Sequence, residues 1–216
     1  MMPNIYNMEQ QMRDEVKHRW AITNQLPAEA SPVRIARLLR ALAVEEPAVW
    51  HHGQRVAWFA IRIGGGLEID RAQMYLAGLL HDLGKLALPA SILDKPGALT
   101  PGEQQRMRLH PTLGAALLPA GPGLLAVHLG VRHHHEQWDG SGYPDGLRGT
   151  DIPLPARIIA IADALDAICM DRPYRPRRSF PAALDIVAQG AGRQFDPDLV
   201  AAMLRVFGNA TAHRPA

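Results

Sequence analysis

The chain has 216 residues, 47% of them hydrophobic, which is enough for one sizeable core and a small appendage. Its 23 Lys and Arg residues nearly balance 21 Asp and Glu residues, and a net charge of +2 argues against general nucleic-acid binding. The single cysteine, Cys169, excludes an internal disulfide, and no apolar run reaches the length of a membrane span or signal peptide, so a cytoplasmic protein is expected.

Leucine and alanine recur at three- and four-residue spacing along nearly the whole chain, which predicts an all-α fold. Residues 1–26 are expected to form a separate helix that ends at Pro27. We divide the chain into an N-terminal helical extension (1–46), a main domain (47–207) and a flexible tail (208–216).

Three later helix starts carry capping signals. Asp70 and Thr100 are each followed three residues later by Gln or Glu, and Asp196 precedes a proline. The segment 136–155, EQWDGSGYPDGLRGTDIPLP, is too rich in Gly, Pro and Asp for a helix and long for a simple connection. We therefore expect a functional loop there.

The first notable histidine lies on a predicted helix. His52 shares its side of that helix with Val56 and Ile63, so its imidazole is expected to point toward the core. His51 shares its face with Arg55 and is expected to point to solvent. Taken alone, a histidine in the position of His52 is more often a core residue with a satisfied hydrogen bond than a metal ligand.

Further inward-directed polar side chains follow along the chain. They are His81 and Asp82 in AGLLHDLGK, His110 after the helix that begins near Thr100, His134 and His135 before the glycine-rich loop, and Asp163 in RIIAIADALDA. Each of them alone could be a buried polar group with a backbone partner. Together with His52 they would carry a large desolvation cost without a shared counter-charge, which divalent metal ions supply.

The donor types narrow the choice of metal. Nitrogen and oxygen ligands without thiolate favour iron, manganese, zinc, nickel or cobalt over a soft metal, and among these we expect iron or manganese. Seven ligands exceed the four of a closed structural zinc site, so two metal ions are predicted. Asp82 has two carboxylate oxygens and is the natural bridge between them.

Five motifs occur in a fixed order: HDLGK at 81–85, HP at 110–111, HHE at 134–136, DGSGYP at 139–144 and DRPYR at 171–175. With His52 and Asp163, this set resembles the HD superfamily of metal-dependent phosphohydrolases and, within it, the HD-GYP branch. The resemblance covers about residues 47–206. It implies an HD-domain helical fold with an extended GYP loop, and a bacterial phosphodiesterase that hydrolyses cyclic di-GMP to linear pGpG, with GMP as a further product.

The resemblance also implies roles for single residues. His52, His81, Asp82 and Asp163 would bind one metal, and His110, His134 and His135 would bind a second metal that Asp82 also reaches. Asp82 and Lys85 are the expected catalytic residues, because the metals would activate a water and Lys85 would contact the phosphate. The alternative for Lys85 is a solvated surface lysine.

Substrate contacts are expected from two segments. Arg172 and Arg175 are spaced to present two guanidinium groups to phosphate or guanine, although RPYRPRR could also be a solvated charge run. Gly142, Tyr143 and Pro144 form the GYP loop, where the tyrosine ring would stack on a base or anchor the loop.

Three functional alternatives stay open. The first is cyclic di-GMP hydrolysis. Two metals are expected for it, because members of the family with a third metal carry a glutamate where this chain has Ala48. The second is hydrolysis of another cyclic dinucleotide or nucleotide. The third is a weakly active scaffold whose GYP loop binds diguanylate cyclase (GGDEF) domains. A homodimer is a further expected assembly.

Overall fold

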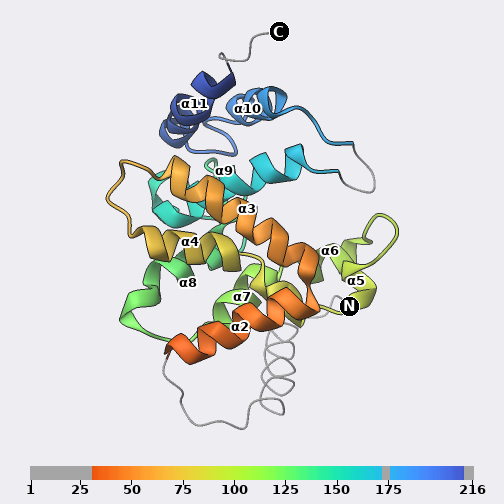
Figure 1. The fold of residues 1–216 in the computed structure, drawn as a ribbon. Helices are drawn as coiled ribbons and strands as arrows, with labels where there is room; N and C mark the ends of the chain where they lie inside the picture. The colour runs from red at the N-terminus through yellow and green to blue at the C-terminus, as the bar shows by residue number, and fades with distance from the viewer. Residues whose placement is uncertain (1–30, 172–175, 212–216) are drawn as a thin grey trace.

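The computed structural model describes residues 31–171 and 176–211, and those residues form a chain of helices joined by loops (Figure 1). The longer helices are α2 (Ser31–Glu45), α3 (Pro47–Ile63), α4 (Arg71–Leu80), α8 (Leu125–His133), α9 (Leu154–Cys169), α10 (Phe180–Gln189) and α11 (Pro197–Thr211). The shorter ones are η1 (Leu83–Ala87), α5 (Ala90–Leu93), α6 (Pro101–Met107), α7 (His110–Leu117), η2 (Pro122–Leu124) and η3 (Gly149–Asp151).

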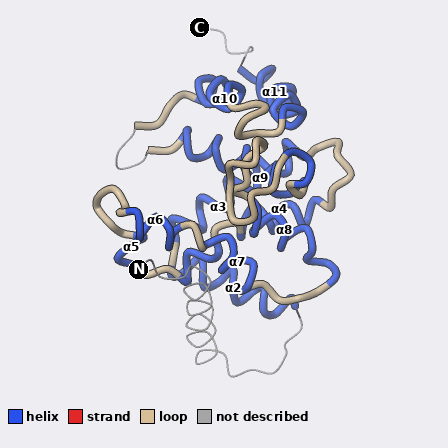
Figure 2. Tube along the Cα trace, turned by 180° about the vertical axis from the view of Figure 1, so that it is seen from behind, coloured by secondary structure: helices blue, strands red, loops and turns tan. Residues whose placement is uncertain are grey.

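The prediction of an all-α fold is confirmed. Within the described residues, the sole β-type pairing is an isolated bridge between Ala191 and Phe195, and Figure 2 shows helices and loops alone. The connection from α8 to α9 is a long loop with one turn of 3₁₀ helix and contains residues 136–153 of the predicted irregular segment, whose last two residues begin α9 instead. In the described part of the chain, we find no helix with the length and apolar character that crossing a membrane requires.

The core lies where α3 and α9 cross the middle of the molecule, between α10 and α11 at one end and α2 and α7 at the other (Figure 1). Val56 and Ile63 of α3, and Ile158, Ile161 and Leu165 of α9, are completely buried there. Because these residues recur at three- and four-residue spacing, each helix presents one apolar side to the core. The polar residues of the candidate site lie beside this apolar packing.

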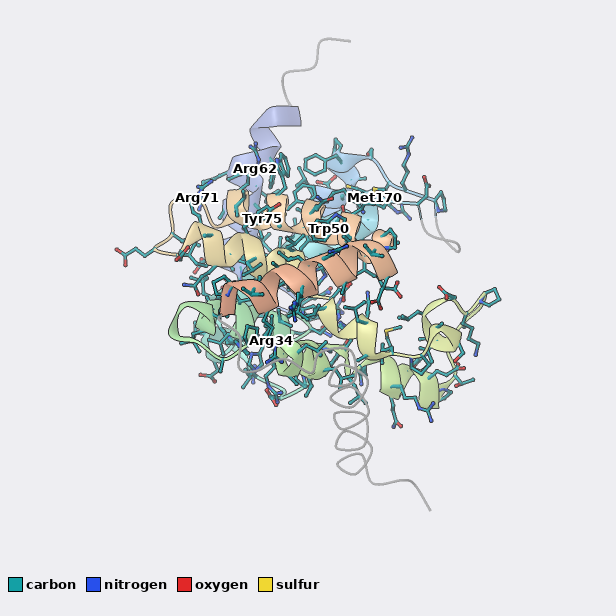
Figure 3. The ribbon with its side chains drawn as sticks, turned by 60° about the horizontal axis from the view of Figure 1, so that its bottom comes forward. Arg34, Trp50, Arg62, Arg71, Tyr75 and Met170 are labelled. Carbon is teal, nitrogen blue, oxygen red and sulfur yellow. The ribbon has the colours of Figure 1, made fainter. Side chains whose placement is uncertain are left out.

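The outer side of α3 faces solvent. Trp58 is 45% exposed, and the Arg62 guanidinium covers its ring at 4.1 Å from the ring centroid. Arg62 and the exposed Tyr75 of α4 lie on the surface that Figure 3 displays. The inner and outer sides of α3 thus differ in the way that its apolar spacing predicts.

Three helix starts are capped as the sequence predicts. The Asp70 carboxylate accepts the backbone N–H groups of residues 72 and 73 at the start of α4. Thr100 and Glu103 form a complete capping box on α6. Asp196 accepts the backbone N–H groups of residues 198 and 199 at the start of α11. These caps fix where the helices begin and therefore where their inward side chains lie.

The segment directly before α3 packs against the core. Leu38 and Leu42 of α2 are buried in the same hydrophobic cluster as the residues of α3 and α9. The predicted helix at 1–26 lies outside the described residues, as do the last five residues of the predicted tail. The division into an extension, a main domain and a tail therefore stays a prediction.

Candidate metal centre

Five helices deliver the predicted ligands to one place. His52 comes from α3, His81 caps the end of α4, His110 opens α7, His134 caps the end of α8, and Asp163 lies within α9. Asp82 and His135 follow directly after two of these caps. His81, Asp82 and His134 are only 1%, 3% and 2% exposed, so their polar atoms must be satisfied inside the protein.

Close backbone approach places Asp82 beside His110. Gly84 packs so tightly against α7 that a Cβ atom there would collide with the His110 carbonyl oxygen. Asp82 directly precedes η1 and this contact, and its Oδ1 lies 3.1 Å from His110 Nε2. The glycine in HDLGK therefore has a packing reason: it brings the loop after α4 onto the first turn of α7.

Three imidazoles are oriented in the same way. In each, the Nδ1 atom lies 2.7–2.8 Å from the carbonyl oxygen three residues earlier, and the pairs are His81 with Gly78, His110 with Met107 and His134 with Val131. A carbonyl oxygen can only accept, so Nδ1 carries the proton in each ring. When such a ring is neutral, its Nε2 atom directs a lone pair into the site, as metal-binding histidines require.

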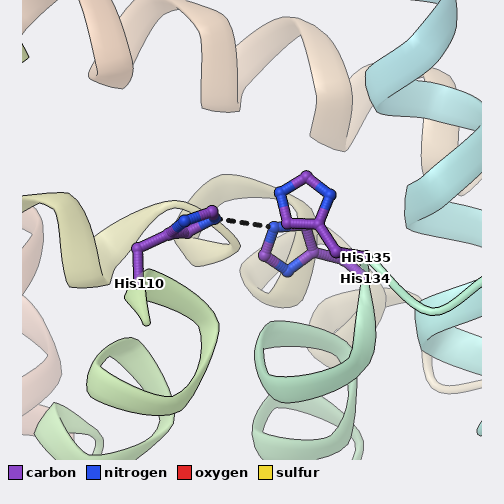
Figure 4. Close-up of side chains that lie close together, drawn as sticks. All are labelled: His110, His134 and His135. Atoms are coloured by element: carbon purple, nitrogen blue, oxygen red, sulfur yellow. Dashed lines mark hydrogen bonds between the residues drawn. The ribbon is translucent and has the colours of Figure 1, made fainter. Parts of the chain in front are cut away.

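The Nε2 atoms of His81, His110 and His134 are poorly matched to one another. The buried Nε2 atom of His81 has no hydrogen-bond partner among the described residues. The Nε2 atoms of His110 and His134 lie 3.2 Å apart and face each other (Figure 4). Since both Nδ1 atoms donate to carbonyls, two neutral rings would set two lone pairs against each other. A shared cation removes this conflict, so the donor set fits a metal ion.

The ligand atoms fall into sets that could each hold an ion. The donor atoms of His110, His134 and His135 lie within 4.8 Å of one another, and so do those of His52, His81 and Asp163. Asp82 lies between the two sets. Its Oδ1 faces His110, and its Oδ2 lies 3.5 Å from His81 Nε2 and 3.8 Å from His52 Nε2. Each carboxylate oxygen therefore faces a different set.

The ionisation states suit metal binding. Burial and the neighbouring His135 lower the pKa of His134 well below its usual range, and burial together with His110 lowers the pKa of His135 to about 3. Both rings are therefore neutral near pH 7. Burial alone would raise the pKa of Asp82, but Lys85, His81 and His110 together outweigh it and hold that pKa well below the usual range. The carboxylate is ionised and able to bind a cation.

The sequence analysis missed the group that orients His52. Asp166 is 2% exposed, and its Oδ2 lies 2.7 Å from His52 Nδ1 while Arg55 Nε donates to its Oδ1 at 2.6 Å. Arg55 was placed with the solvent-facing His51, yet its guanidinium reaches inward to this carboxylate. The signal was Asp166 itself, one helical turn after Asp163 on α9.

His52 also contacts Asp163 directly, with Nε2 lying 3.1 Å from Oδ1. Burial opposes the charged imidazolium, but the hydrogen bonds to Asp163 and Asp166 outweigh it and raise the pKa of His52 to about 9. A proton on His52 thus offsets one of the two carboxylate charges that contact its ring. A divalent cation between His52 Nε2 and Asp163 would supply the same neutralisation and leave the Asp166 bond in place.

The GYP loop is fixed by charged residues at its base. The buried Glu136 carboxylate accepts the backbone N–H groups of residues 145, 146 and 147, and Arg132 forms a bidentate pair with Asp145. Gly142 packs against the backbone of residues 136 and 137, where a Cβ atom would collide. Glu136 in the HHE motif therefore anchors the loop, a role that the sequence analysis did not assign.

Tyr143 lies over the candidate centre. Its ring stacks on His135 with centroids 4.8 Å apart and an interplanar angle of 26°, and the peptide bond to Pro144 is cis. The Arg108 guanidinium covers the tyrosine ring at 4.6 Å from its centroid. The ring thus packs directly on one of the seven predicted ligands. The sequence analysis did not single out Arg108.

The structure thus brings all seven predicted metal ligands together. Lys85 also lies there, paired with Asp82, and Tyr143 covers one side. Arg172 and Arg175 lie outside the described residues. The roles of these residues as ligands or substrate contacts stay predictions.

Comparison with known proteins supports the same picture. A family model described as HD domain matches residues 37–199. The cyclic di-GMP phosphodiesterase response regulator RpfG of Xanthomonas campestris pv. campestris is 36% identical over 214 residues, which cover 94% of this chain and 56% of that protein. The 3'3'-cGAMP-specific phosphodiesterase 1 of Vibrio cholerae is 42% identical over 142 residues, covering 64% of this chain and 33% of that protein.

A solved structure shares the fold. The crystal structure of a cyclic GMP-AMP specific phosphodiesterase of V. cholerae matches with a TM-score of 0.60 and 24% identity, over 84% of this chain and 49% of that one. The chain spans 56% of RpfG and smaller shares of the second relative and of this structure.

Proposed function

The chain belongs to the HD domain family, as its motifs indicated, and we propose that it is a metal-dependent phosphodiesterase that hydrolyses cyclic di-GMP to linear pGpG. The observation that carries the proposal is the cluster of imidazole Nε2 atoms around the Asp82 carboxylate, in which those of His110 and His134 face each other and that of His81 has no hydrogen-bond partner among the described residues. The relative named a cyclic di-GMP phosphodiesterase, which aligns with 94% of the chain, supports the substrate.

We assign seven ligands to two divalent metal ions, with iron or manganese as the first choice. His52, His81 and Asp163 would hold one ion, His110, His134 and His135 the other, and Asp82 would reach both. When bound, such ions supply positive charge to the phosphate and lower the pKa of a water molecule. Zinc, nickel and cobalt suit the same donors.

The side chains of the chain prepare the site for this chemistry. Backbone carbonyls hold three imidazoles in the tautomer that leaves Nε2 free, so no proton has to leave those atoms before an ion binds. Lys85 neutralises the buried Asp82 carboxylate and lies where its ammonium can also contact a phosphate oxygen. Tyr143 stacks on His135 and limits access from one side.

Hydrolysis of the cyclic diester then follows ordinary displacement at phosphorus. A water oxygen forms a bond to phosphorus, the bond from phosphorus to the ribose 3′ oxygen breaks, and that oxygen takes up a proton. The product is a linear dinucleotide with a 5′ phosphate, and a second cleavage would give GMP. Arg172 and Arg175 remain predicted contacts for phosphate or guanine, and Gly142, Tyr143 and Pro144 remain predicted contacts from the loop.

A second candidate substrate is 3'3'-cGAMP. The relative named for that substrate is 42% identical over the part of the chain that aligns with it, which supports this candidate. 3'3'-cGAMP differs from cyclic di-GMP in having adenine in place of one guanine. Docking of GGDEF domains on the GYP loop and formation of a homodimer stay predictions.

The test is hydrolysis of a panel of cyclic dinucleotides by protein purified anaerobically with iron or manganese. We expect cyclic di-GMP to be converted to pGpG with the highest kcat/KM, and chelated protein to be inactive. Higher kcat/KM for 3'3'-cGAMP would move the assignment to the second candidate. Metal-loaded protein that cleaves no cyclic dinucleotide would refute the enzyme assignment and favour the scaffold.

A further inference from the structure

Two contacts meet at the Tyr143 ring beside the candidate centre. The ring stacks on His135, with centroids 4.8 Å apart, and the Arg108 guanidinium lies over the same tyrosine ring at 4.6 Å from its centroid. Arg108 itself is exposed, at the end of α6 and two residues before His110. Tyr143 therefore contacts both the Arg108 cation and His135, a proposed metal ligand.

The other cations around the site are already paired. The pairs are Lys85 with Asp82, Arg55 with Asp166 and Arg132 with Asp145. By contrast, the Arg108 side chain makes no hydrogen bond or ion pair with any residue that the structure describes, and its guanidinium instead lies over the Tyr143 ring. Stacking orients the guanidinium plane but leaves its N–H groups free to bind an anion.

A cyclic dinucleotide presents a suitable anion. It carries two phosphates separated by nucleosides, and only one can lie at the metal centre for hydrolysis. The second phosphate must lie some distance away, where its charge needs a partner. We propose that Arg108, held on Tyr143, binds the phosphate that is not being cleaved. The proposal rests on the proposed function and extends it by naming what distinguishes a cyclic dinucleotide from a simple diester.

The test replaces Arg108 by Gln, which keeps a polar side chain but removes the charge and the planar fork of donors. The metal-loaded variant should lose about ten- to a hundredfold in kcat/KM for the cyclic dinucleotide that the wild type cleaves best, mainly through a higher KM. Bis-nitrophenyl phosphate has one phosphate, so its hydrolysis should change less than twofold. Arg108→Lys should restore part of the loss.

Arg106→Gln is the matched control, because Arg106 is an exposed arginine on the same helix, and it should leave both substrates unaffected. Equal losses on both substrates, an unchanged KM for the dinucleotide, or a fall in metal content would overturn the proposal. A loss confined to guanine-containing dinucleotides would also overturn it, since that result assigns Arg108 to a base. Failure of the proposed function is distinguishable, because the wild type would then cleave no cyclic dinucleotide.

Discussion

Replacing Asp166 by Asn tests whether metal binding depends on the carboxylate behind His52. Asp166 Oδ2 lies 2.7 Å from His52 Nδ1, and Arg55 donates to the same carboxylate at 2.6 and 3.0 Å. The amide has no charge and one oxygen fewer, so it cannot hold both partners, and Arg55 loses its counter-charge. Removing such a supporting carboxylate typically costs about 10- to 100-fold in metal affinity or activity, or about 1.4–2.8 kcal/mol.

The assay is competition for iron or manganese with a chelator of known affinity, followed by kcat/KM at saturating metal. Asp166→Asn should bind metal 10- to 100-fold more weakly, and Arg55→Gln should show a smaller loss because His52 keeps its partner. Asp185→Asn is the control, since Asp185 is exposed on α10, outside the candidate site. Wild-type metal affinity in Asp166→Asn would refute the reasoning that this carboxylate orients a ligand.

Four further outcomes are expected. Asp82→Ala should remove the residue between the two ligand sets, lower metal content and abolish hydrolysis while circular dichroism stays helical, and activity in the metal-replete variant would contradict the mechanism. Protein prepared with adequate iron or manganese should contain close to two metal ions per chain by elemental analysis, and a third ion at full occupancy would overturn that count. Gly84→Ala should lower the free energy of unfolding by about 2–3 kcal/mol in denaturant titrations, because its Cβ meets the His110 backbone, whereas an unchanged midpoint would disprove that clash. Glu136→Gln should speed amide hydrogen exchange at residues 145–147 by weakening three hydrogen bonds, and unchanged exchange would show that the loop is held by other contacts.

Helical periodicity was enough to predict the inward direction of two of the proposed ligands. His52 lies among apolar neighbours on α3, and Asp163 does so on α9, so the predicted direction of each followed from spacing alone. The start of α6 was also predicted correctly, because a capping box depends only on residues close together in the sequence. These features depend on the local geometry of one helix, which explains why sequence reasoning reached them.

The contacts that sequence reasoning missed join distant segments. Arg55 and Asp166 pair across the interface of α3 and α9, and the angle at which two helices cross cannot be read from either helix alone. Arg108 meets Tyr143 because Glu136 fixes the shape of a loop without periodicity. Side-chain partners of this kind depend on tertiary packing, so the residue types alone could not predict which side chains would pair.

Anomalous diffraction from crystals of metal-loaded protein tests the central claim most directly. Data collected above and below the absorption edge of the loaded metal should show two peaks. One should lie among His52, His81 and Asp163 and the other among His110, His134 and His135, with Asp82 contacting both. A single peak, or peaks away from these side chains, would contradict the two-metal centre.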